Sequence, residues 1–179
     1  MTTTTVRKAK AHDADRILTL VNDLAAQQIM LPRSPVAIVE NIRDFVVAEV
    51  EGEFAGCGAL HVVWSDLAEV RSIAVEPKAQ GKGIGKRMLE WLIKDALELE
   101  LARIFAFTYV PGFFEKMDFA IVEHGDLPHK VFSDCLNCPK FNRCDEIAML
   151  RVLKESNEEH GQGPLSTPSS GFPLPRIQL

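Results

Sequence analysis

The sequence is poor in aromatic residues and carries no excess of positive charge. Aromatic residues make up 7% of its 179 residues, and Tyr109 is the single tyrosine, so only one side chain can supply a phenolic proton. The formal net charge of −5 gives no electrostatic support to a nucleic-acid-binding role. No apolar run reaches the ~18 residues that cross a bilayer, so we expect neither nucleic acid nor a membrane as partner.

The N-terminal residues lack the apolar stretch of a signal peptide, so we expect a cytoplasmic protein. Its four cysteines are then reduced by default. An apolar fraction of 46% is enough for a real core. From Ser156 onward Gly, Pro, Ser and Glu dominate, and such a segment buries too little apolar surface to offset its ordering entropy. We predict a domain over residues 1–155 and a disordered tail over residues 156–179.

Hydrophobic periodicity predicts a mixture of strands and helices in the domain. Ser34 followed by Pro35 is typical of a helix N-cap and first helical position, and Glu51-Gly-Glu53 indicates a hairpin turn. Helices are predicted from residues 13 and 34, after a glycine-rich loop to about residue 101, and over residues 112–117. The predicted strands are residues 6–9, 45–51, 54–63, 68–75, 103–110, 119–123 and 147–153.

The glycine-rich loop lies between a strand that ends at Val75 and a helix with apolar positions from Met88 to Leu97. Glycines let backbone N–H groups approach a ligand, and a helix N-terminus adds its positive dipole end, so the loop predicts a phosphate site. The spacing fits neither the Walker A motif nor G-x-G-x-x-G. A glycine-rich turn without a ligand is the alternative. The glycines and basic residues of the loop are Gly81, Gly83, Gly85, Lys78, Lys82, Lys86 and Arg87.

The pattern Gln80-x-x-Gly83-x-Gly85 after Ala74-Val75 resembles the pyrophosphate loop of the GNAT N-acetyltransferase superfamily. The resemblance implies an α+β GNAT acetyltransferase fold, with a mixed, mostly antiparallel sheet flanked by helices, and acetyl-CoA as co-substrate. In that superfamily a bulge in the strand before the loop exposes backbone N–H groups to the thioester; ordinary ladder pairing is the alternative. The residues that the resemblance assigns to acetyl-CoA are Ile73, Ala74, Val75, Gln80, Gly81, Lys82, Gly83, Ile84, Gly85 and Lys86.

Two charged residues precede the loop on the same predicted strand. Glu69 and Arg71 share a face with Ile73 if the strand is regular there, because strand residues alternate with period two. A glutamate on this strand is the usual superfamily candidate for the base that deprotonates the amine. The neighbouring arginine favours the carboxylate form, which argues against a strong base. An ion pair at the sheet surface is the alternative reading.

The proton donor to the leaving thiolate departs from the superfamily pattern. The superfamily often has a tyrosine in a helix after the next strand, and Phe114 occupies that position here. A phenyl ring cannot donate a proton, so Tyr109, at the end of the preceding strand, is the candidate acid. Packing with a satisfied hydroxyl is the alternative role for this tyrosine.

Five short segments together resemble the short ArgA-like N-acetylglutamate synthases, also called amino-acid N-acetyltransferases. They are residues 30–34, 58–61, 66–72, 107–109 and 127–131. The resemblance implies an acetyl-CoA:L-glutamate N-acetyltransferase that performs the first step of arginine biosynthesis, and it is compatible with a homodimer. Arg33, Arg71 and Lys130 are then expected to bind the two carboxylates of L-glutamate, with Arg forks acting as bidentate donors; each could instead be a solvated surface charge.

Two alternative functions remain open from the sequence. One is a GNAT enzyme that acetylates another small amine. The other is an acyl-CoA-binding sensor module whose cysteine-rich loop contacts a partner. Turnover of acetyl-CoA with a panel of amino acids distinguishes these three classes.

A cysteine-rich stretch contains the spacing C-x2-C and a third cysteine nearby. Cys135, Cys138 and Cys144 are candidate zinc ligands, whereas Cys57 lies in a predicted strand and is expected in the core. Three reduced thiols that pack a loop, or a redox-sensitive disulfide, are the alternatives. The fourth zinc ligand would come from His129, Asp134 or Asp145.

Elemental analysis tests the zinc hypothesis. If the three cysteines ligate zinc, protein purified without added metal should contain a near-stoichiometric amount. Less than about a tenth of an equivalent, together with three titratable thiols in this stretch, would instead support the metal-free alternatives.

Overall fold

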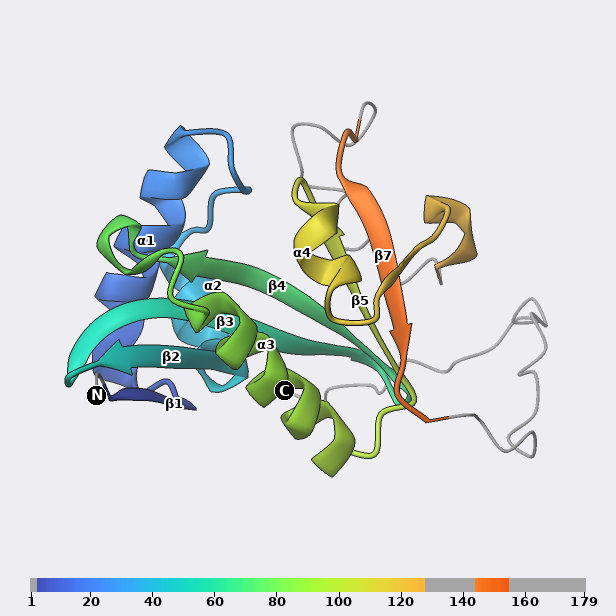
Figure 1. The fold of residues 1–179 in the computed structure, drawn as a ribbon, viewed down its shortest axis with the longest axis horizontal. Coiled ribbons are helices and arrows are strands. Elements are labelled where there is room, and N and C mark those ends of the chain that lie inside the picture. The colour runs from blue at the N-terminus through green and yellow to red at the C-terminus, as the bar shows by residue number, and fades with distance from the viewer. Residues whose placement is uncertain (1–2, 128–143, 155–179) are drawn as a thin grey trace, which may run out of the picture.

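The computed structural model describes residues 3–127 and 144–154. Within these residues seven strands form one sheet in the order β1-β2-β3-β4-β5-β7-β6 (Figure 1). Neighbouring strands are antiparallel except for β4 and β5, which are parallel. The strands are β1 (Thr4–Lys8), β2 (Phe45–Val50), β3 (Glu53–Trp64), β4 (Leu67–Val75), β5 (Arg103–Thr108), β6 (Ala120–Ile121) and β7 (Ile147–Val152). The predicted mixed, mostly antiparallel sheet is confirmed.

Helices and short 3-10 turns connect the strands. The helices are α1 (Ala14–Ala26), α2 (Pro35–Glu40), α3 (Ile84–Glu98) and α4 (Pro111–Glu115), and the turns are η1 (Ala11–Asp13), η2 (Ile42–Asp44), η3 (Pro77–Ala79) and η4 (His124–Asp126). The predicted cap is confirmed, because the Ala37 N–H donates to Ser34 Oγ at 3.1 Å.

Several predicted elements extended beyond the observed ones, among them α3 and β6. The helix α3 ends at Glu98 rather than near residue 101, since Glu100 has a φ of 59° and leaves the right-handed helical region. The strand β6 has 2 residues and stops before η4, where the Asp126 carboxylate accepts from the Glu123 N–H and turns the chain.

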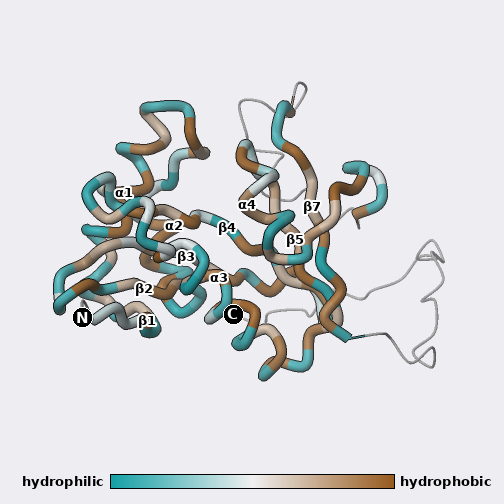
Figure 2. Tube along the Cα trace, in the orientation of Figure 1, coloured by the Kyte–Doolittle hydropathy of each residue, from teal (hydrophilic) through white to brown (hydrophobic). Residues whose placement is uncertain are grey.

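The core lies on both faces of the sheet. On one face α3 and α4 pack through residues such as Leu92 and Phe114, and on the other α1 and α2 pack through Ile17 and Ile38. Figure 2 shows the resulting alternation of hydrophobic and hydrophilic segments along α3 and the central strands. Cys57 is fully buried in the second cluster, as predicted, and burial raises the pKa of its thiol to about 12.

The parallel strands β4 and β5 pair over only part of their length. Their register joins Leu67 to Arg103 and ends with Glu69 opposite Phe105. Beyond that point the strands separate, and Figure 1 shows β4 running towards α1 while β5 runs towards α4.

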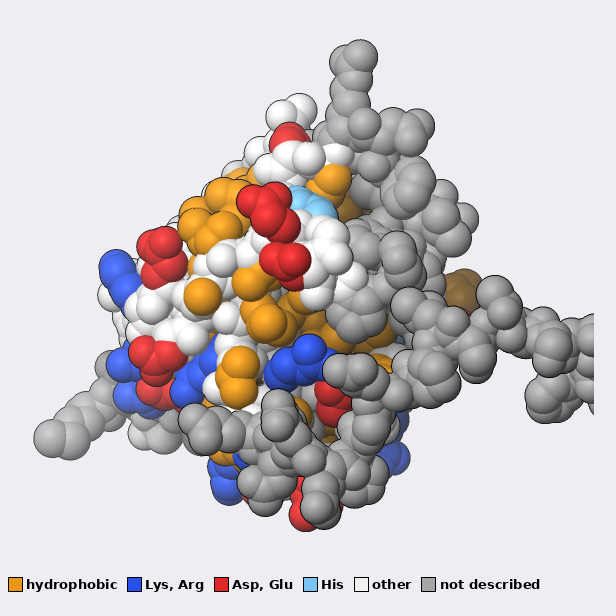
Figure 3. Space-filling view, turned by 90° about the vertical axis from the view of Figure 1, so that its right-hand side faces the viewer, with side chains coloured by type: hydrophobic (Ala, Val, Ile, Leu, Met, Phe, Trp, Pro, Cys, Tyr) orange, Lys and Arg blue, Asp and Glu red, His pale blue; other side chains and the backbone are white. Residues whose placement is uncertain are grey.

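Among the described residues no helix is long and apolar enough to cross a membrane. The face in Figure 3 carries acidic, basic and apolar side chains in a mixture, without a continuous basic patch over the residues that are coloured there. This distribution agrees with the net charge of −5.

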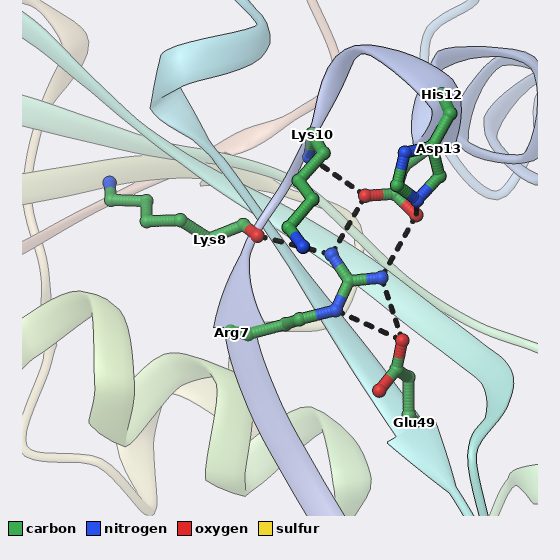
Figure 4. A network of polar contacts seen from close by, with 6 residues as sticks. All are labelled: Arg7, Lys8, Lys10, His12, Asp13 and Glu49. Atoms are coloured by element: carbon green, nitrogen blue, oxygen red, sulfur yellow. Dashed lines mark hydrogen bonds and ion pairs between the residues drawn. The ribbon is translucent and has the colours of Figure 1, made fainter.

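A buried carboxylate anchors the start of α1 to the sheet (Figure 4). Arg7 in β1 donates from both terminal nitrogens to Asp13, at 2.8 and 3.1 Å, and also binds Glu49 in β2 at 2.7 Å. The Lys10 N–H donates to the same Asp13 carboxylate at 2.7 Å. The hydrogen bonds from Arg7 hold the pKa of Asp13 below its ordinary value, so the carboxylate is charged when the protein is folded.

This network predicts a pH-dependent loss of stability. Because the folded-state pKa of Asp13 is lowered, its contribution is fully present above the unfolded value of about 3.9 and is lost as pH falls through the folded value. Asp13→Asn should cost roughly 1.5–3 kcal/mol at pH 7, the range for hydrogen bonds to charged groups. Urea unfolding at pH 7 and pH 3 should show the difference from the parent shrinking at the lower pH.

The matched control is Asp118→Asn, whose side chain is 86% exposed and lies 3.7 Å from Arg151. Exposed ion pairs contribute about 0–1 kcal/mol, so this variant should unfold almost as the parent does. Equal stability of Asp13→Asn and the parent at pH 7 would contradict the anchoring role.

Candidate active site

The strand β4 contains a bulge next to the opening in the sheet. Its register with β3 joins Cys57 to Ala74 but Ala59 to Arg71, so one residue of β3 faces two of β4. Ser72 has a φ of 56°, a conformation that non-glycine residues rarely adopt. The Cys57 thiol donates to the Ser72 carbonyl at 3.7 Å, which ties the bulge to β3.

The bulge leaves backbone donors of β4 directed towards the opening. The Glu76 N–H donates to the Ala55 carbonyl of β3 at 2.9 Å. Since N–H groups alternate between the two edges of a strand, the Val75 N–H points to the other edge, where β5 has separated. The orientation of the Val75 carbonyl supports this direction, because the carbonyl accepts from Gln80 Nε2 at 3.2 Å on that edge. The sequence-predicted donor Val75 therefore faces the opening, and Ile73 follows by the same alternation.

The glycine-rich loop leads from this strand into α3. Gly81 and Gly83 have φ values of 73° and 74°, and a Cβ at either would meet no atom within 4 Å. Gly83 is the N-cap of α3, so the first N–H groups of the helix open onto free space. Lys82 and Lys86 are exposed beside it. This open, donor-rich and basic helix start fits a pyrophosphate group.

A cavity of about 350 Å³ joins the loop to the opening in the sheet. It combines backbone from the bulge, the start of α3 and the aromatic ring of Phe113 in α4 with residues of the opposite face of the sheet. The lining residues are Met30, Val70, Arg71, Ser72, Ile73, Val75, Gln80, Gly85, Phe107, Thr108, Val110, Phe113 and Phe114. A ligand that enters over α3 can thus meet a second ligand that enters from the α1 and α2 side.

Glu69 and Arg71 lie on the α1 and α2 face of β4, but the predicted placement of Ile73 beside them was wrong. Arg71 pairs with Ala59, which belongs to the core cluster of α1 and α2, and Val70 faces α3 instead. The bulge at Ser72 then shifts the alternation, so Ile73 packs with the α3 cluster. The charged pair and the Ile73 side chain therefore lie on opposite faces of the sheet, and Arg71 and Ile73 both line the cavity.

The charged pair is largely shielded from water. Arg71 Nη1 lies 3.7 Å from Glu69 Oε2, and the two side chains are 9% and 16% exposed. The predicted ion pair is therefore present, and Arg71 also lines the cavity. Through Arg71 the ion pair borders the cavity, and Glu69 lies directly behind it.

The predicted acceptor-binding Arg33 is held by a residue that sequence reasoning missed. Asn22 in α1 donates from Nδ2 to the Arg33 carbonyl at 3.0 Å, and its Oδ1 accepts from the Arg33 N–H at 2.9 Å. This two-way clamp fixes the α1–α2 loop, from which Met30 enters the cavity. A side-chain amide that hydrogen-bonds both the N–H and the carbonyl of a residue in another element leaves no local sequence signal.

The position of Tyr109 differs from the one expected of a proton donor to the leaving thiolate. Its hydroxyl donates to Asp145 Oδ1 at 2.9 Å, and it is not among the described residues that line the cavity. Phe114 does line the cavity and is buried in the α3 cluster. The acid role of Tyr109 stays a prediction.

Thr108 is a second residue that sequence reasoning missed. It is 6% exposed and lines the cavity at the end of β5. Its Oγ1 accepts from the Val110 N–H at 3.0 Å, which leaves the hydroxyl hydrogen available as a donor. A buried threonine that follows a strand pattern looks like any β-branched core residue, so the sequence does not reveal it.

The remaining candidates lie wholly or partly outside the described residues. Lys130, Cys135 and Cys138 fall in the range 128–143, and only Cys144, which is exposed, is described. In the two described ranges no group of three His, Cys, Asp or Glu side chains is arranged to hold a metal ion. The zinc hypothesis therefore stays a prediction.

Comparison with known proteins identifies the class of enzyme. Residues 31–119 match the model of the acetyltransferase (GNAT) family. An uncharacterized N-acetyltransferase of Chlorobaculum tepidum is 40% identical over 150 residues, which cover 84% of this chain and 97% of the relative. The chain therefore belongs to the GNAT acetyltransferase family, as the glycine loop indicated.

Other relatives carry more specific names. An amino-acid acetyltransferase of Mycobacterium tuberculosis is 39% identical over 132 residues, which cover 72% of this chain and 75% of the relative. The structure of N-acetylglutamate synthase from Neisseria gonorrhoeae, complexed with coenzyme A and N-acetyl-glutamate, matches with a TM-score of 0.77 and 28% identity. That match covers 85% of this chain but 35% of the longer synthase. The α+β GNAT fold is thus confirmed.

The glycine loop gives a direct test of the coenzyme A site. Gly83→Val should lower coenzyme A affinity more than tenfold, at least ~1.4 kcal/mol, because a branched side chain crowds the backbone donors. Titration calorimetry on the folded variant measures this.

A matched control separates crowding from backbone strain. Gly52, in the turn between β2 and β3, has a φ of 81° and equally open surroundings, so Gly52→Val carries similar strain far from the loop. It should lose stability but keep coenzyme A affinity. Unchanged affinity in a folded Gly83→Val protein would refute the assignment of the loop.

Proposed function

We propose that the protein transfers the acetyl group of acetyl-CoA to the α-amino group of L-glutamate, which makes N-acetylglutamate for arginine biosynthesis. The observation that carries the proposal is the position of Arg71. This side chain is 9% exposed and lines the cavity that also receives the backbone of the bulge and the start of α3. The names of the Mycobacterium and Neisseria relatives support an amino-acid acceptor.

The acceptor carboxylates would bind on the α1 and α2 side of the sheet. Arg71 supplies a guanidinium fork at the cavity wall, and Arg33 lies on the loop that Asn22 clamps. Planar forks match carboxylate geometry in two parallel hydrogen bonds. Lys130, outside the described residues, is the third predicted contact. These cations favour a dicarboxylic amino acid over a neutral or basic one.

Acetyl-CoA would bind from the opposite side. The N–H groups at the start of α3 and the exposed Lys82 and Lys86 suit its pyrophosphate. The Val75 N–H, directed into the opening, can donate to the thioester oxygen and stabilise the charge that develops as the amine attacks. Gln80 Nε2 donates to the Val75 carbonyl on the same edge of β4 and so ties the following peptide bond to the loop.

Proton transfers complete the reaction. The acceptor ammonium must lose a proton before it attacks, and Glu69 is the carboxylate beside Arg71 on the acceptor face that can take it. The leaving thiolate needs a proton or a hydrogen-bond donor. The Thr108 hydroxyl lies in the cavity wall, so it suits this role better than Tyr109, whose hydroxyl is bonded to Asp145.

The acceptor preference tests the proposal. The enzyme should acetylate L-glutamate in preference to neutral or basic amino acids. Charge-assisted hydrogen bonds contribute about 1.5–3 kcal/mol, so Arg33→Ala or Arg71→Ala should lower kcat/KM for glutamate roughly tenfold to a hundredfold. Arg71→Lys keeps the charge but loses the fork and should also be impaired. Thiol release measured across an amino-acid panel gives these values.

Arg103→Ala is the matched control. Arg103 pairs with Asp66 at the closed end of β4 and β5 and is 38% exposed, so its loss should leave glutamate kinetics unchanged. Coenzyme A affinity should be the same in all four variants. Folded Ala variants at 33 and 71 that acetylate glutamate at the parent rate would rule out the carboxylate clamp, and a parent that prefers a polyamine would rule out the synthase.

A further inference from the structure

A histidine–aspartate pair lies next to Glu69 on the acceptor face. His61 Nδ1 is 2.6 Å from Asp44 Oδ2, which joins β3 to the turn η2. His61 is also the direct register partner of Glu69 across the β3–β4 ladder. Directly opposed residues have Cβ atoms about 4.5–5.5 Å apart and share one face of the sheet. The next pair, Leu60 and Val70, packs on the α3 face, so His61 and Glu69 both lie on the acceptor face.

The hydrogen bond fixes the state of the imidazole ring. An ionised carboxylate only accepts hydrogen bonds, so His61 Nδ1 must carry the hydrogen that Asp44 binds. In the part of the chain that the structure describes, Asp44 is the ring's hydrogen-bond partner, and Nε2 is then the basic nitrogen of the neutral ring. The His61 side chain is 33% exposed, so the ring links the acceptor face to water.

The ion pair of Glu69 creates a need for such a link. Arg71 Nη1 lies 3.7 Å from Glu69 Oε2. A proton that Glu69 takes from the acceptor ammonium removes the negative charge of this ion pair and must move on before the next turnover. A proton that stayed on Glu69 could return to the amine and reverse the deprotonation. A neighbouring imidazole that is partly exposed can instead carry the proton to solvent.

The charged residues around His61 come from two elements. The turn η2 contributes Asp44 and Arg43, and β4 contributes Glu69 and Arg71. The helix α1 packs on β3 through apolar residues such as Val21, and α3 covers the opposite face of the sheet. Asp44 is thus the charged group bonded to the ring, and its hydrogen bond orients the imidazole.

We propose that His61, oriented by Asp44, accepts from Glu69 the proton that the acceptor ammonium loses and releases it to solvent. An N–H bond of the ammonium breaks as an O–H bond forms on Glu69, and that O–H bond breaks as an N–H bond forms at His61 Nε2. Water then takes this proton. His61 acts through Glu69 and is a positioning residue for the proton path. The inference rests on the proposed amine acetylation with Glu69 as base.

The pH dependence of His61→Gln tests this proposal. In the parent, kcat/KM for glutamate should rise with pH through the window from 5 to 8 in which imidazole loses its proton. His61→Gln should be roughly tenfold to a hundredfold slower at pH 7.5 and should lack this rise, with KM for acetyl-CoA unchanged. Asp44→Asn, which keeps the shape of the contact, should be slowed by a smaller factor.

Chemical rescue distinguishes a role of His61 in proton transfer from a purely structural role. Added imidazole should restore kcat of His61→Ala several-fold and leave the parent unchanged. His12→Gln, which replaces a histidine that is 70% exposed on η1, is the control and should keep the parental profile. Folded His61 variants with the parental pH profile would overturn the relay. So would variants whose loss of activity follows their loss of thermal stability and is not restored by imidazole.

The parent enzyme separates this inference from the function on which it rests. A parent that acetylates no amino acid contradicts the proposed function and the relay together. An active parent whose His61 variants behave as it does contradicts the relay alone.

Discussion

The site depends on one interruption of the sheet, where β4 and β5 stop pairing beyond Glu69 and Phe105. A continuous ladder would consume the backbone donors of β4 and close the cavity. The interruption leaves the Val75 N–H directed into an opening that can be reached from both faces. Acyl transfer needs this arrangement, because a thioester and an amine must approach each other while remote parts of both substrates are held apart.

The bulge at Ser72 makes the opening chemically asymmetric. By shifting the alternation of β4 it places Glu69 and Arg71 on the face of α1 and α2 and Ile73 on the face of α3. A positive φ at a serine costs of order 1–3 kcal/mol, and its surroundings must offset this. Cys57 contributes through its contact with the Ser72 carbonyl. Gly58 contributes by leaving room, since a Cβ there would lie 3.2 Å from Ile73 Cγ1.

The sequence predicted the features that follow from local pattern. Period-two runs, the Ser34 cap and the glycine spacing define the elements, and the loop identified the family before any geometry was known. The face of Ile73 was mispredicted because a bulge changes parity without changing composition. The contacts of Asn22 and of the Asp44–His61 pair join residues distant in the chain, and Thr108 meets the other lining residues only in the cavity, so their roles emerge only when the fold brings them together.

A crystal structure with a non-hydrolysable acetyl-CoA analogue and L-glutamate tests the central claim most directly. We predict that the pyrophosphate binds to the N–H groups at the start of α3. The carbonyl oxygen of the analogue should lie within hydrogen-bond distance of the Val75 N–H. The glutamate amine should enter from the side of Arg71. An analogue bound away from the opening between β4 and β5, or a glutamate bound on the α3 side of the sheet, would contradict it.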